Sequence, residues 1–320
     1  MTFRKRVRKD PPKEEDQCAP PVEEECCEPS ECDECLDPIC EENIPVFDCN
    51  PYPLPKLLTV RHIGTINHID SCPPLASNYS SLAMIVAPDY RAGHFLPMLD
   101  IRAHRADNTC YMFNAGFNGR IIPDACSDLQ AILGANIFYD YRQASLGFFS
   151  QFGVGLEALG DRWEFRGNVY IPFGPRAHHE HCYYDGYIGD YYYMEDIYEY
   201  ISYSFNAEVG YYLRKCNDYF LYLAAGPYYI AGRYCVDKTI GGEIRFRPQY
   251  KDVFAVDLSY RYDSLFKSVF QFEVVVQLPL YKLKSQNCRP CGLTDWQIYQ
   301  PAQRFEVMPV GMKRCYKYNF

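Results

Sequence analysis

Three consecutive segments in the middle of the chain alternate between apolar residues and polar or glycine residues. They are residues 131–140, 151–158 and 162–173. Because successive side chains of a strand point to opposite faces, a period of two predicts β-strands. Only residues 159–161 separate the second segment from the third, so these two should form an antiparallel hairpin. Strands with one apolar face fit either a soluble sandwich, with that face inward, or a membrane barrel, with that face outward.

The other face of these segments carries a recognisable series of residues. It reads G-x-N-x-F-x-D, then G-x-G-x-E, then N-x-Y-x-P, and its members are Gly134, Asn136, Phe138, Asp140, Gly153, Gly155, Glu157, Asn168, Tyr170 and Pro172. The series resembles the β-domain of the inverse autotransporters, the translocators of intimin and invasin adhesins. A weaker similarity extends from about residue 57 to residue 281. The resemblance implies a twelve-stranded outer-membrane barrel with a periplasmic N-terminus, a passenger led out through the lumen, and these ten residues facing the lumen.

Alternation on both sides of this region predicts twelve strands in all. The expected ranges are 57–66, 79–87, 94–105, 109–120, 129–141, 146–159, 162–173, 199–213, 218–231, 238–247, 252–263 and 267–281. Most are long enough to cross a bilayer at a tilt, which takes about 9 to 11 residues. Their polar faces carry charges of both signs, such as Glu157 and Arg166, which suit pairing across a wet lumen. We therefore predict an all-β fold, an antiparallel transmembrane barrel, in preference to a sandwich.

Two segments compete to be the closing strand of this barrel. The C-terminus offers alternating apolar positions that end in an aromatic residue, Phe320, as many outer-membrane barrels do. Pro301 and Pro309 count against it, because proline cannot donate a ladder hydrogen bond inside a sheet. The run over residues 267–281 is longer and cleaner. It should therefore pair with the first strand and leave the rest of the chain as a lumenal or periplasmic tail.

The beginning of the chain differs in composition from the rest. Residues 1–50 contain 15 Asp and Glu against 6 Lys and Arg, a difference of −9 that equals the formal net charge of the whole chain. They also hold seven cysteines and almost no large apolar residues, so they cannot bury a core. The sequence thus predicts a disordered tail and proline-rich linker over residues 1–54, the barrel over 55–283 and a C-terminal tail over 284–320.

The 16 cysteines bear on the compartment of the protein. An oxidising envelope would pair them, whereas a reducing cytosol would leave them as thiols or metal ligands. Two C-x-x-C pairs are spaced like zinc ligands, but they lie far apart in the sequence and one is in the acidic tail. We therefore favour disulfides, within the tail or between molecules, over zinc and over free thiols. The candidates are Cys18, Cys26, Cys27, Cys32, Cys35, Cys40, Cys49, Cys288 and Cys291.

The longest predicted connection, residues 174–198, follows the seventh strand, which ends outside the cell if the N-terminus is periplasmic. Long outer and short inner connections are typical of transmembrane barrels. This loop contains His178-His179-Glu180-His181-Cys182, a set of donors that suits a soft divalent metal. Adjacent ligands in a loop often bind metals adventitiously, so we expect no functional metal site here. The tyrosines that follow are better suited to a contact surface.

Several other classes of protein find no support. No apolar run is long enough for a transmembrane helix, which takes about 18 residues or more. A basic stretch at residues 4–9 is followed by Asp10-Pro11-Pro12 instead of the apolar core of a signal peptide, so we expect the precursor to begin upstream of Met1. The G-x-S-x-G, P-loop and H-E-x-x-H motifs are missing, so we expect neither an enzyme nor a cofactor. The acidic balance without a basic patch argues against nucleic acid.

The sequence therefore predicts an integral outer-membrane β-barrel of a Gram-negative bacterium, similar to the inverse autotransporter translocator. Only residues 282–320 follow the last predicted strand, too few for an adhesive domain, so a free-standing, porin-like envelope protein is the first expectation. A translocator or adhesin anchor with a short lumenal C-terminal segment is the second, and a soluble β-sandwich binding module is the third. Expected partners are outer-membrane lipid, the barrel assembly machinery and disulfide-linked envelope proteins.

Overall fold

The computed structural model describes residues 54–67, 78–89, 93–106, 110–123, 131–188, 191–215, 219–232, 238–264, 267–280, 293, 295–305 and 310–319. Nearly all of the predicted N-terminal tail and all nine candidate disulfide cysteines lie outside these residues. The elements are β1 (Leu54–Asn67), β2 (Tyr79–Ala87), β3 (Phe95–Ala106), β4 (Tyr111–Ile121), β5 (Ala131–Gln143), β6 (Phe148–Gly160), β7 (Trp163–Phe173), β8 (Ala177–Ile188), β9 (Tyr191–Ile201), β10 (Ser204–Lys215), β11 (Tyr219–Ile230), β12 (Thr239–Tyr250), β13 (Phe254–Asp263), β14 (Lys267–Pro279), α1 (Asp295–Tyr299) and β15 (Val310–Asn319).

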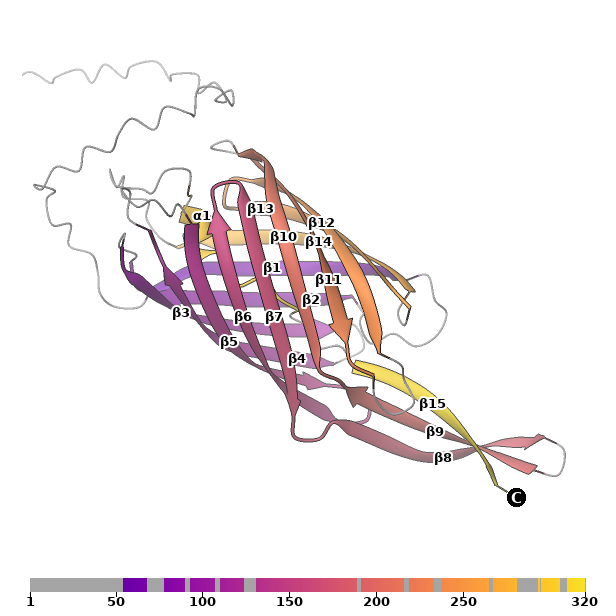
Figure 1. Cartoon of the computed structure of the whole chain (residues 1–320). Coiled ribbons are helices and arrows are strands. Elements are labelled where there is room, and N and C mark those ends of the chain that lie inside the picture. Colours follow the sequence, from indigo (N-terminus) through magenta and orange to yellow (C-terminus); the bar gives the residue numbers. More distant parts are fainter. Residues whose placement is uncertain are drawn as a thin grey trace, which may run out of the picture. The chain divides into compact units, whose positions relative to one another are not determined.

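Twelve strands form a closed antiparallel barrel in the order β1-β14-β13-β12-β11-β10-β7-β6-β5-β4-β3-β2 (Figure 1). Closure occurs between the first strand and β14, whose register runs from Leu57 opposite Pro279 to Asn67 opposite Val269. The predicted fold class, the number of barrel strands and the closing strand are confirmed. Within the described part of the chain, no helix has both the length and the apolar character needed to cross a membrane.

The prediction of a loop over residues 174–198 was wrong. The strands β8 and β9 form an antiparallel ribbon there, and β9 pairs on its other side with β15, giving a separate sheet in the order β15-β9-β8. The predicted eighth strand, residues 199–213, is correspondingly divided between the end of β9 and β10. Tyrosine and acidic residues follow one another so densely in this region that the sequence shows no apolar and polar alternation. The aromatic residues nevertheless favour the extended backbone.

The two faces of the barrel wall have opposite character. Apolar side chains cover the outside, where Leu156 is 67% exposed and Val154 is 44% exposed. Charged side chains line the inside, where Asp100 and Arg120 are each 0% exposed. A sandwich would bury its apolar face, so this arrangement rules out that alternative. An apolar surface that encircles the barrel is stable only against lipid, as in transmembrane barrels.

The connections between barrel strands define two ends. The proximal end is the one at which β1 begins, and the connections 88–94, 122–130, 161–162, 216–218 and 251–253 lie there. The distal end carries the connections 68–78, 107–110, 144–147, 174–203, 231–238 and 264–266. The shortest connection is thus proximal, and the longest, which contains β8 and β9, is distal. Chain order alone therefore places the three-stranded sheet on the distal side.

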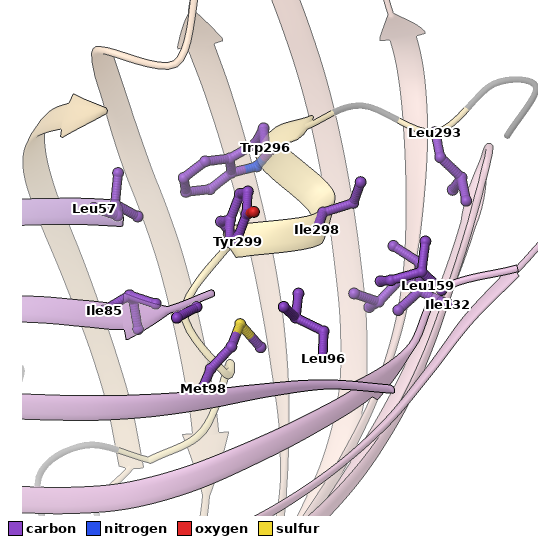
Figure 2. Packing of buried hydrophobic residues seen from close by; sticks show 12 residues of the cluster. Leu57, Ile85, Leu96, Met98, Ile132, Leu159, Leu293, Trp296, Ile298 and Tyr299 are labelled. Carbon is purple, nitrogen blue, oxygen red and sulfur yellow. The ribbon is translucent and has the colours of Figure 1, made fainter. Parts of the chain in front are cut away.

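Helix α1 lies inside the barrel near its proximal end. Trp296, Ile298 and Tyr299 are at most 4% exposed. They pack against the lumenal side of strands β1, β2, β3, β5 and β6, near the proximal ends of these strands (Figure 2). The wall residues of this cluster include Leu57, Ile85, Ala87, Leu96, Met98, Ile122, Ile132 and Leu159. Full burial of one such side chain stabilises the packed state by about 1.5 to 3 kcal/mol. This apolar layer holds the helix in a lumen that is otherwise polar.

Candidate functional site in the barrel lumen

The lumenal segment, defined as residues 295–305, is held at its helical end by Arg120 of β4. The Arg120 guanidinium donates to the carbonyl oxygens of Ile298 at 2.7 Å and Gln297 at 3.3 Å, both at the C-terminal end of α1. The same side chain donates to Glu157 of β6 at 2.6 Å. A cation is favourable at a helix C-terminus, where carbonyl groups lack helical partners. Glu157, one of the family-motif residues, therefore fixes the arginine that fixes the helix.

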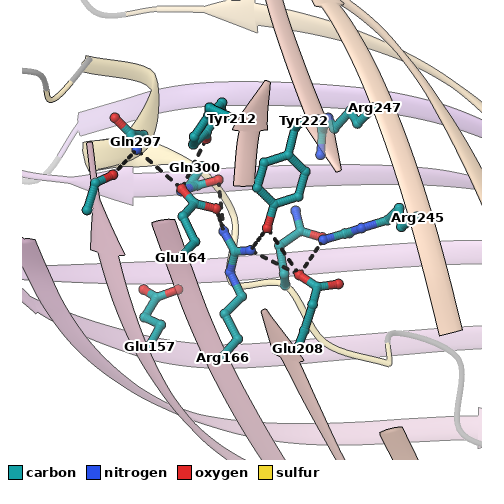
Figure 3. A network of polar contacts seen from close by, with 12 residues as sticks. Glu157, Glu164, Arg166, Glu208, Tyr212, Tyr222, Arg245, Arg247, Gln297 and Gln300 are labelled. Carbon is teal, nitrogen blue, oxygen red and sulfur yellow. Dashed lines mark hydrogen bonds and ion pairs between the residues drawn. The ribbon is translucent and has the colours of Figure 1, made fainter. Parts of the chain in front are cut away.

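A second set of contacts joins the same helix to strand β7. The carboxylate of Glu164 accepts hydrogen bonds from the side-chain amides of Gln297 and Gln300, both at 3.3 Å, and from Tyr212 at 3.0 Å (Figure 3). Its charge is balanced by Arg166, at 2.5 Å. A buried carboxylate is stable only when it is paired and fully hydrogen-bonded, and Glu164 has both kinds of partner.

Arg304 makes the closest polar contact between the lumenal segment and the middle of the wall. Its two terminal nitrogens donate to the two carboxylate oxygens of Asp140 at 2.9 and 2.5 Å. The guanidinium centre also lies 4.2 Å from the ring centre of Phe138 and 5.3 Å from that of Tyr170. Both side chains of the ion pair are almost inaccessible, at 1% and 2% exposure. A planar bidentate pair between aromatic faces is an arrangement that arginine suits and lysine does not.

The residues beside Arg304 are also bound to the wall. The backbone N–H of Phe305 donates to the hydroxyl of Tyr170 at 2.6 Å, and the two rings stack with centres 5.7 Å apart. Asn168 donates to the carbonyl oxygen of Gln303 at 3.2 Å. On strand β3, Arg102 donates to the carbonyl oxygen of Ala302 at 2.9 Å. Four successive residues of the segment are thus each anchored to the barrel.

Glycines of the wall leave the space that these contacts need. A Cβ atom added to Gly153 would collide with the guanidinium of Arg304, and one added to Gly155 would collide with Asn168 and Asn136. At Gly134 the obstacle would be the carboxylate of Glu157. Glycine weakens a strand unless something approaches its backbone closely. Here the approaching group at Gly153 comes from the lumenal segment itself.

All ten residues of the family series are on the inner side of the wall. Gly134 is half-buried, and the other nine, from Asn136 to Pro172, are buried. Phe138, Asp140, Gly153, Asn168 and Tyr170 meet the segment directly, and Glu157 acts through Arg120. Sequence reasoning missed Arg304 and Phe305, because nothing local in residues 300–305 indicates what they bind.

Beside the lumenal segment the lumen contains a cavity of about 100 Å³. Its charged lining residues are Arg61, Arg166, Arg245, Arg247, Arg261, Arg304, Glu208, Glu243, Asp257 and Glu273. Most of them pair with each other, as Arg245 does with Glu208 at 2.7 Å and Arg261 with Glu243 at 3.0 Å. Fixed charges of both signs make the cavity wettable without giving it one dominant sign.

Glu199 joins the distal sheet to the barrel. Its carboxylate, at the base of β9, accepts the backbone N–H groups of Ser145 at 3.2 Å and Leu146 at 2.7 Å in the turn between β5 and β6. His178 of β8 contacts the carbonyl oxygen of Phe148 at 3.0 Å. The base of the sheet is therefore fixed to the barrel rim.

The metal and cysteine hypotheses involve few described side chains. His178 and His179 are described, whereas the side chains of His181 and Cys182 are outside the described part. Among the described side chains, no group of three or more His, Cys, Asp or Glu is arranged to hold a metal ion. Cys110 is buried and free.

Comparison with known proteins agrees with this architecture. The model of the family described as "Inverse autotransporter, beta-domain" matches residues 70–184, which confirms the resemblance over that part of the chain. No curated protein matches the chain.

Solved structures also match the chain. One, described as "Unveiling the Mechanism Behind the in-meso Crystallization of Membrane Proteins", is 16% identical with a TM-score of 0.55, covering 80% of this chain and 100% of its own. The KdgM porin (10% identity, TM-score 0.41, 70% and 99% covered) and the translocator domain of the autotransporter NalP from Neisseria meningitidis (9%, 0.31, 73% and 90%) are also similar. The closed barrel, its apolar exterior and the family match together define an integral outer-membrane β-barrel.

Proposed function

We propose that this barrel is a translocator-type membrane anchor that holds its own C-terminal segment in the lumen and presents the following strand, β15, outside the cell. The observation that carries the proposal is the buried, bidentate pair between Arg304 and Asp140, inside the ring of strands. A porin would gain nothing from a pore lined with glycines and then filled by its own chain. No chemical step is needed for this role, so we also propose that it is not enzymatic.

The lengths of the connections support one orientation of the barrel in the membrane. We place the proximal end in the periplasm and the distal end outside, because the longest connection is distal and the shortest is proximal. The sheet of β8, β9 and β15 then projects from the cell surface. In this orientation the acidic, cysteine-rich residues 1–50 lie in the periplasm, where they are free to form disulfides with other envelope proteins. Insertion would depend on the barrel assembly machinery.

The experiment is protease mapping on intact cells of a Gram-negative host. A protease site is inserted at residues 189–190, between β8 and β9, and a matched site at residues 216–218, between β10 and β11. The proposal expects cleavage of the first in intact cells and of the second only after the outer membrane is opened. Cleavage of the second alone in intact cells would reverse the orientation.

A porin-like function is the second candidate, and the cavity beside the lumenal segment, lined by charged side chains of both signs, favours it. Planar-bilayer conductance separates the two. A translocator-type anchor should conduct little until Arg304→Ala and Phe305→Ala loosen the segment. A steady, large conductance of the unaltered chain would favour the porin.

A further inference from the structure

The lumenal segment runs from the proximal to the distal end of the barrel. Gln297 donates to the carbonyl oxygen of Gly160, at the proximal end of β6, at 2.9 Å. Further along the chain, Arg304 lies against Gly153, in the middle of the same strand. The backbone therefore leaves the lumen at the distal rim, where β15 pairs with β9 (Figure 1).

The register of β15 follows the order in which the chain leaves the barrel. Val310, the first residue of β15, is opposite Ile201 at the base of β9. Asn319, the last, is opposite Tyr192 near the other end of β9, and the register does not shift in between. Ile201 itself is buried against Phe149 at the rim. Each residue that emerges thus meets its partner on β9 in turn, so pairing can advance from the base outward.

We propose that the free edge of β9 in the β8 and β9 ribbon is a strand-accepting site, and that its occupant is the C-terminal strand of the same chain, β15. Pairing at this edge captures the strand as it emerges and prevents its return into the lumen. The inference rests on the proposed function in one respect, that the distal end of the barrel is outside the cell.

The acceptor is placed without the help of β15. The strands β8 and β9 are consecutive in the sequence, and such local pairs form before contacts between distant segments. At the base of the ribbon, Glu199 accepts the backbone N–H groups of Ser145 and Leu146. Ile201 donates its N–H to the carbonyl oxygen of Arg176 at 3.0 Å. These contacts do not involve β15, so the β9 edge is in position before the strand arrives.

The two edges of the ribbon differ in a way that directs the strand to β9. The strand β8 is irregular at two places, between Glu180 and Tyr183 and between Tyr184 and Gly186. Bulges interrupt the ladder of hydrogen bonds and protect an edge strand from further pairing. The edge of β9 is regular, because ten successive residues pair there with β15. A strand that comes out of the lumen therefore meets one edge suited to it.

One hydrogen bond assigns the backbone groups that form the ladder between β9 and β15. Ile201 donates toward β8, to Arg176. Successive residues of a strand point their N–H and C=O groups to opposite sides, so Tyr198, three residues earlier, points toward β15. The partner of Tyr198 is Lys313, whose N–H and C=O groups must point back toward β9.

The same alternation divides the residues of β15 into two sets. The N–H groups of Lys313 and Lys317 face β9, whereas those of Arg314 and Tyr316 face the open edge of the sheet. Proline removes the N–H group, so it breaks the ladder in the first set and leaves it intact in the second. Each set contains a basic residue, which matches the charge that is lost at position 313 with that lost at position 314.

The test compares two double variants of the full chain, each with an epitope tag after Phe320, in a Gram-negative host. One carries Lys313→Pro and Lys317→Pro, and the other carries Arg314→Pro and Tyr316→Pro. Antibody labelling of the tag on intact cells should fall about fivefold or more in the first, because each lost ladder bond weakens pairing about tenfold. The second should be labelled as well as the unaltered tagged chain. Heat-modifiable migration shows that the barrel has folded in each.

Equal labelling of the two double variants would overturn the inference, because the strand would then stay outside without the β9 edge. Amide hydrogen exchange at Tyr198 in the purified chains is the second measurement. It should be about tenfold or more faster in the first variant than in the second, and equal rates would contradict the assigned ladder. Should a double variant not insert, the single variants Lys313→Pro and Arg314→Pro give the same comparison.

The failure of this inference can be told from the failure of the proposed function. If the unaltered tagged chain is not labelled on intact cells and protease cuts only at residues 216–218, the barrel has the reverse orientation and the anchor function fails. If the unaltered chain is labelled and both double variants are labelled equally, the anchor function stands and only the capture of β15 by β9 is lost.

Discussion

Arg304 and Asp140 are 164 positions apart in the chain, yet their side chains form a bidentate ion pair inside the barrel. Asp140 belongs to the second half of strand β5. Arg304 belongs to the lumenal segment, which follows the closing strand β14 in the sequence. The pair therefore depends on the complete fold, and it reports whether the lumenal segment is in place.

Neutralising Asp140 should leave the buried guanidinium of Arg304 without a counter-charge. We expect Asp140→Asn to lower the free energy of unfolding by about 3 to 5 kcal/mol, the usual cost of breaking a buried ion pair from one side. Urea-dependent unfolding in a bilayer measures it. Asp140→Asn combined with Arg304→Met should recover most of the loss, because the unpaired charge is then removed. A double variant as unstable as the single one would show that the pair itself is unimportant.

Gly153 should tolerate no side chain while the lumenal segment is seated. Gly153→Val places a branched side chain where the guanidinium of Arg304 lies, so the segment should be displaced and become accessible to protease. Gly167→Val is the matched control on the neighbouring strand, because a Cβ atom there meets nothing within 4 Å. If both variants protect the segment as well as the unaltered chain does, the clearance at Gly153 has no role.

A charged side chain on the outer face of the barrel should destabilise the inserted protein. Val154 is 44% exposed on the apolar exterior, and Val154→Arg should destabilise the membrane-inserted barrel by about 2 to 4 kcal/mol if the residue is near the bilayer midplane. Val154→Leu serves as the control for a change of size alone. Folding yield into lipid vesicles, measured by heat-modifiable gel migration, gives the answer. Indifference to arginine would mean that this face does not touch lipid.

The barrel should close without the lumenal segment. A chain ending at residue 283 retains β1 and β14, whose pairing completes the ring. It should insert and remain heat-modifiable, with a lower melting temperature because Trp296 and Ile298 no longer fill the proximal end. If the shortened chain does not assemble while the full one does, residues 284–320 contain an insertion signal.

The cysteine-rich tail should form covalent links. Seven thiols in a segment without a core of its own are open to exchange with neighbouring molecules. Non-reducing electrophoresis of envelopes, with thiols alkylated during lysis, should show high-mass species that collapse on reduction. Removal of residues 18–49 should abolish them while heat-modifiable migration persists. A single monomeric band from alkylated, unreduced envelopes would contradict the tether.

The sequence was informative where one strand face differed chemically from the other. Strands such as β6 and β7 alternate cleanly, because one side meets lipid and the other a polar lumen, and their ends were predicted to within two residues. The tyrosine-rich stretch that became β8 and β9 lacks that contrast, since a ribbon beyond the barrel rim has no lipid face. A period of two in hydrophobicity is therefore absent there and could not reveal the two strands.

The site was only half predictable for a different physical reason. Asp140, Gly153 and Tyr170 belong to a pattern of fixed spacing along adjacent strands, so the series could be recognised before its purpose was known. Arg304 and Phe305 follow a break at Pro301 and touch the wall only through tertiary contacts. No periodicity links positions so far apart in the chain.

The lumenal segment makes the number of times that the chain crosses the barrel odd. Twelve barrel strands bring the backbone back to the face from which it started, as any even number does. Residues 295–305 then pass through the ring toward β15, which pairs with β9 beyond the distal rim. That passage is a thirteenth crossing, so Leu54, where β1 begins, and the strand Val310–Asn319 are on opposite sides of the membrane. A pull on β15 away from the barrel is therefore borne first by the contacts of residues 302–305 with the wall, among them the Arg304 and Asp140 pair.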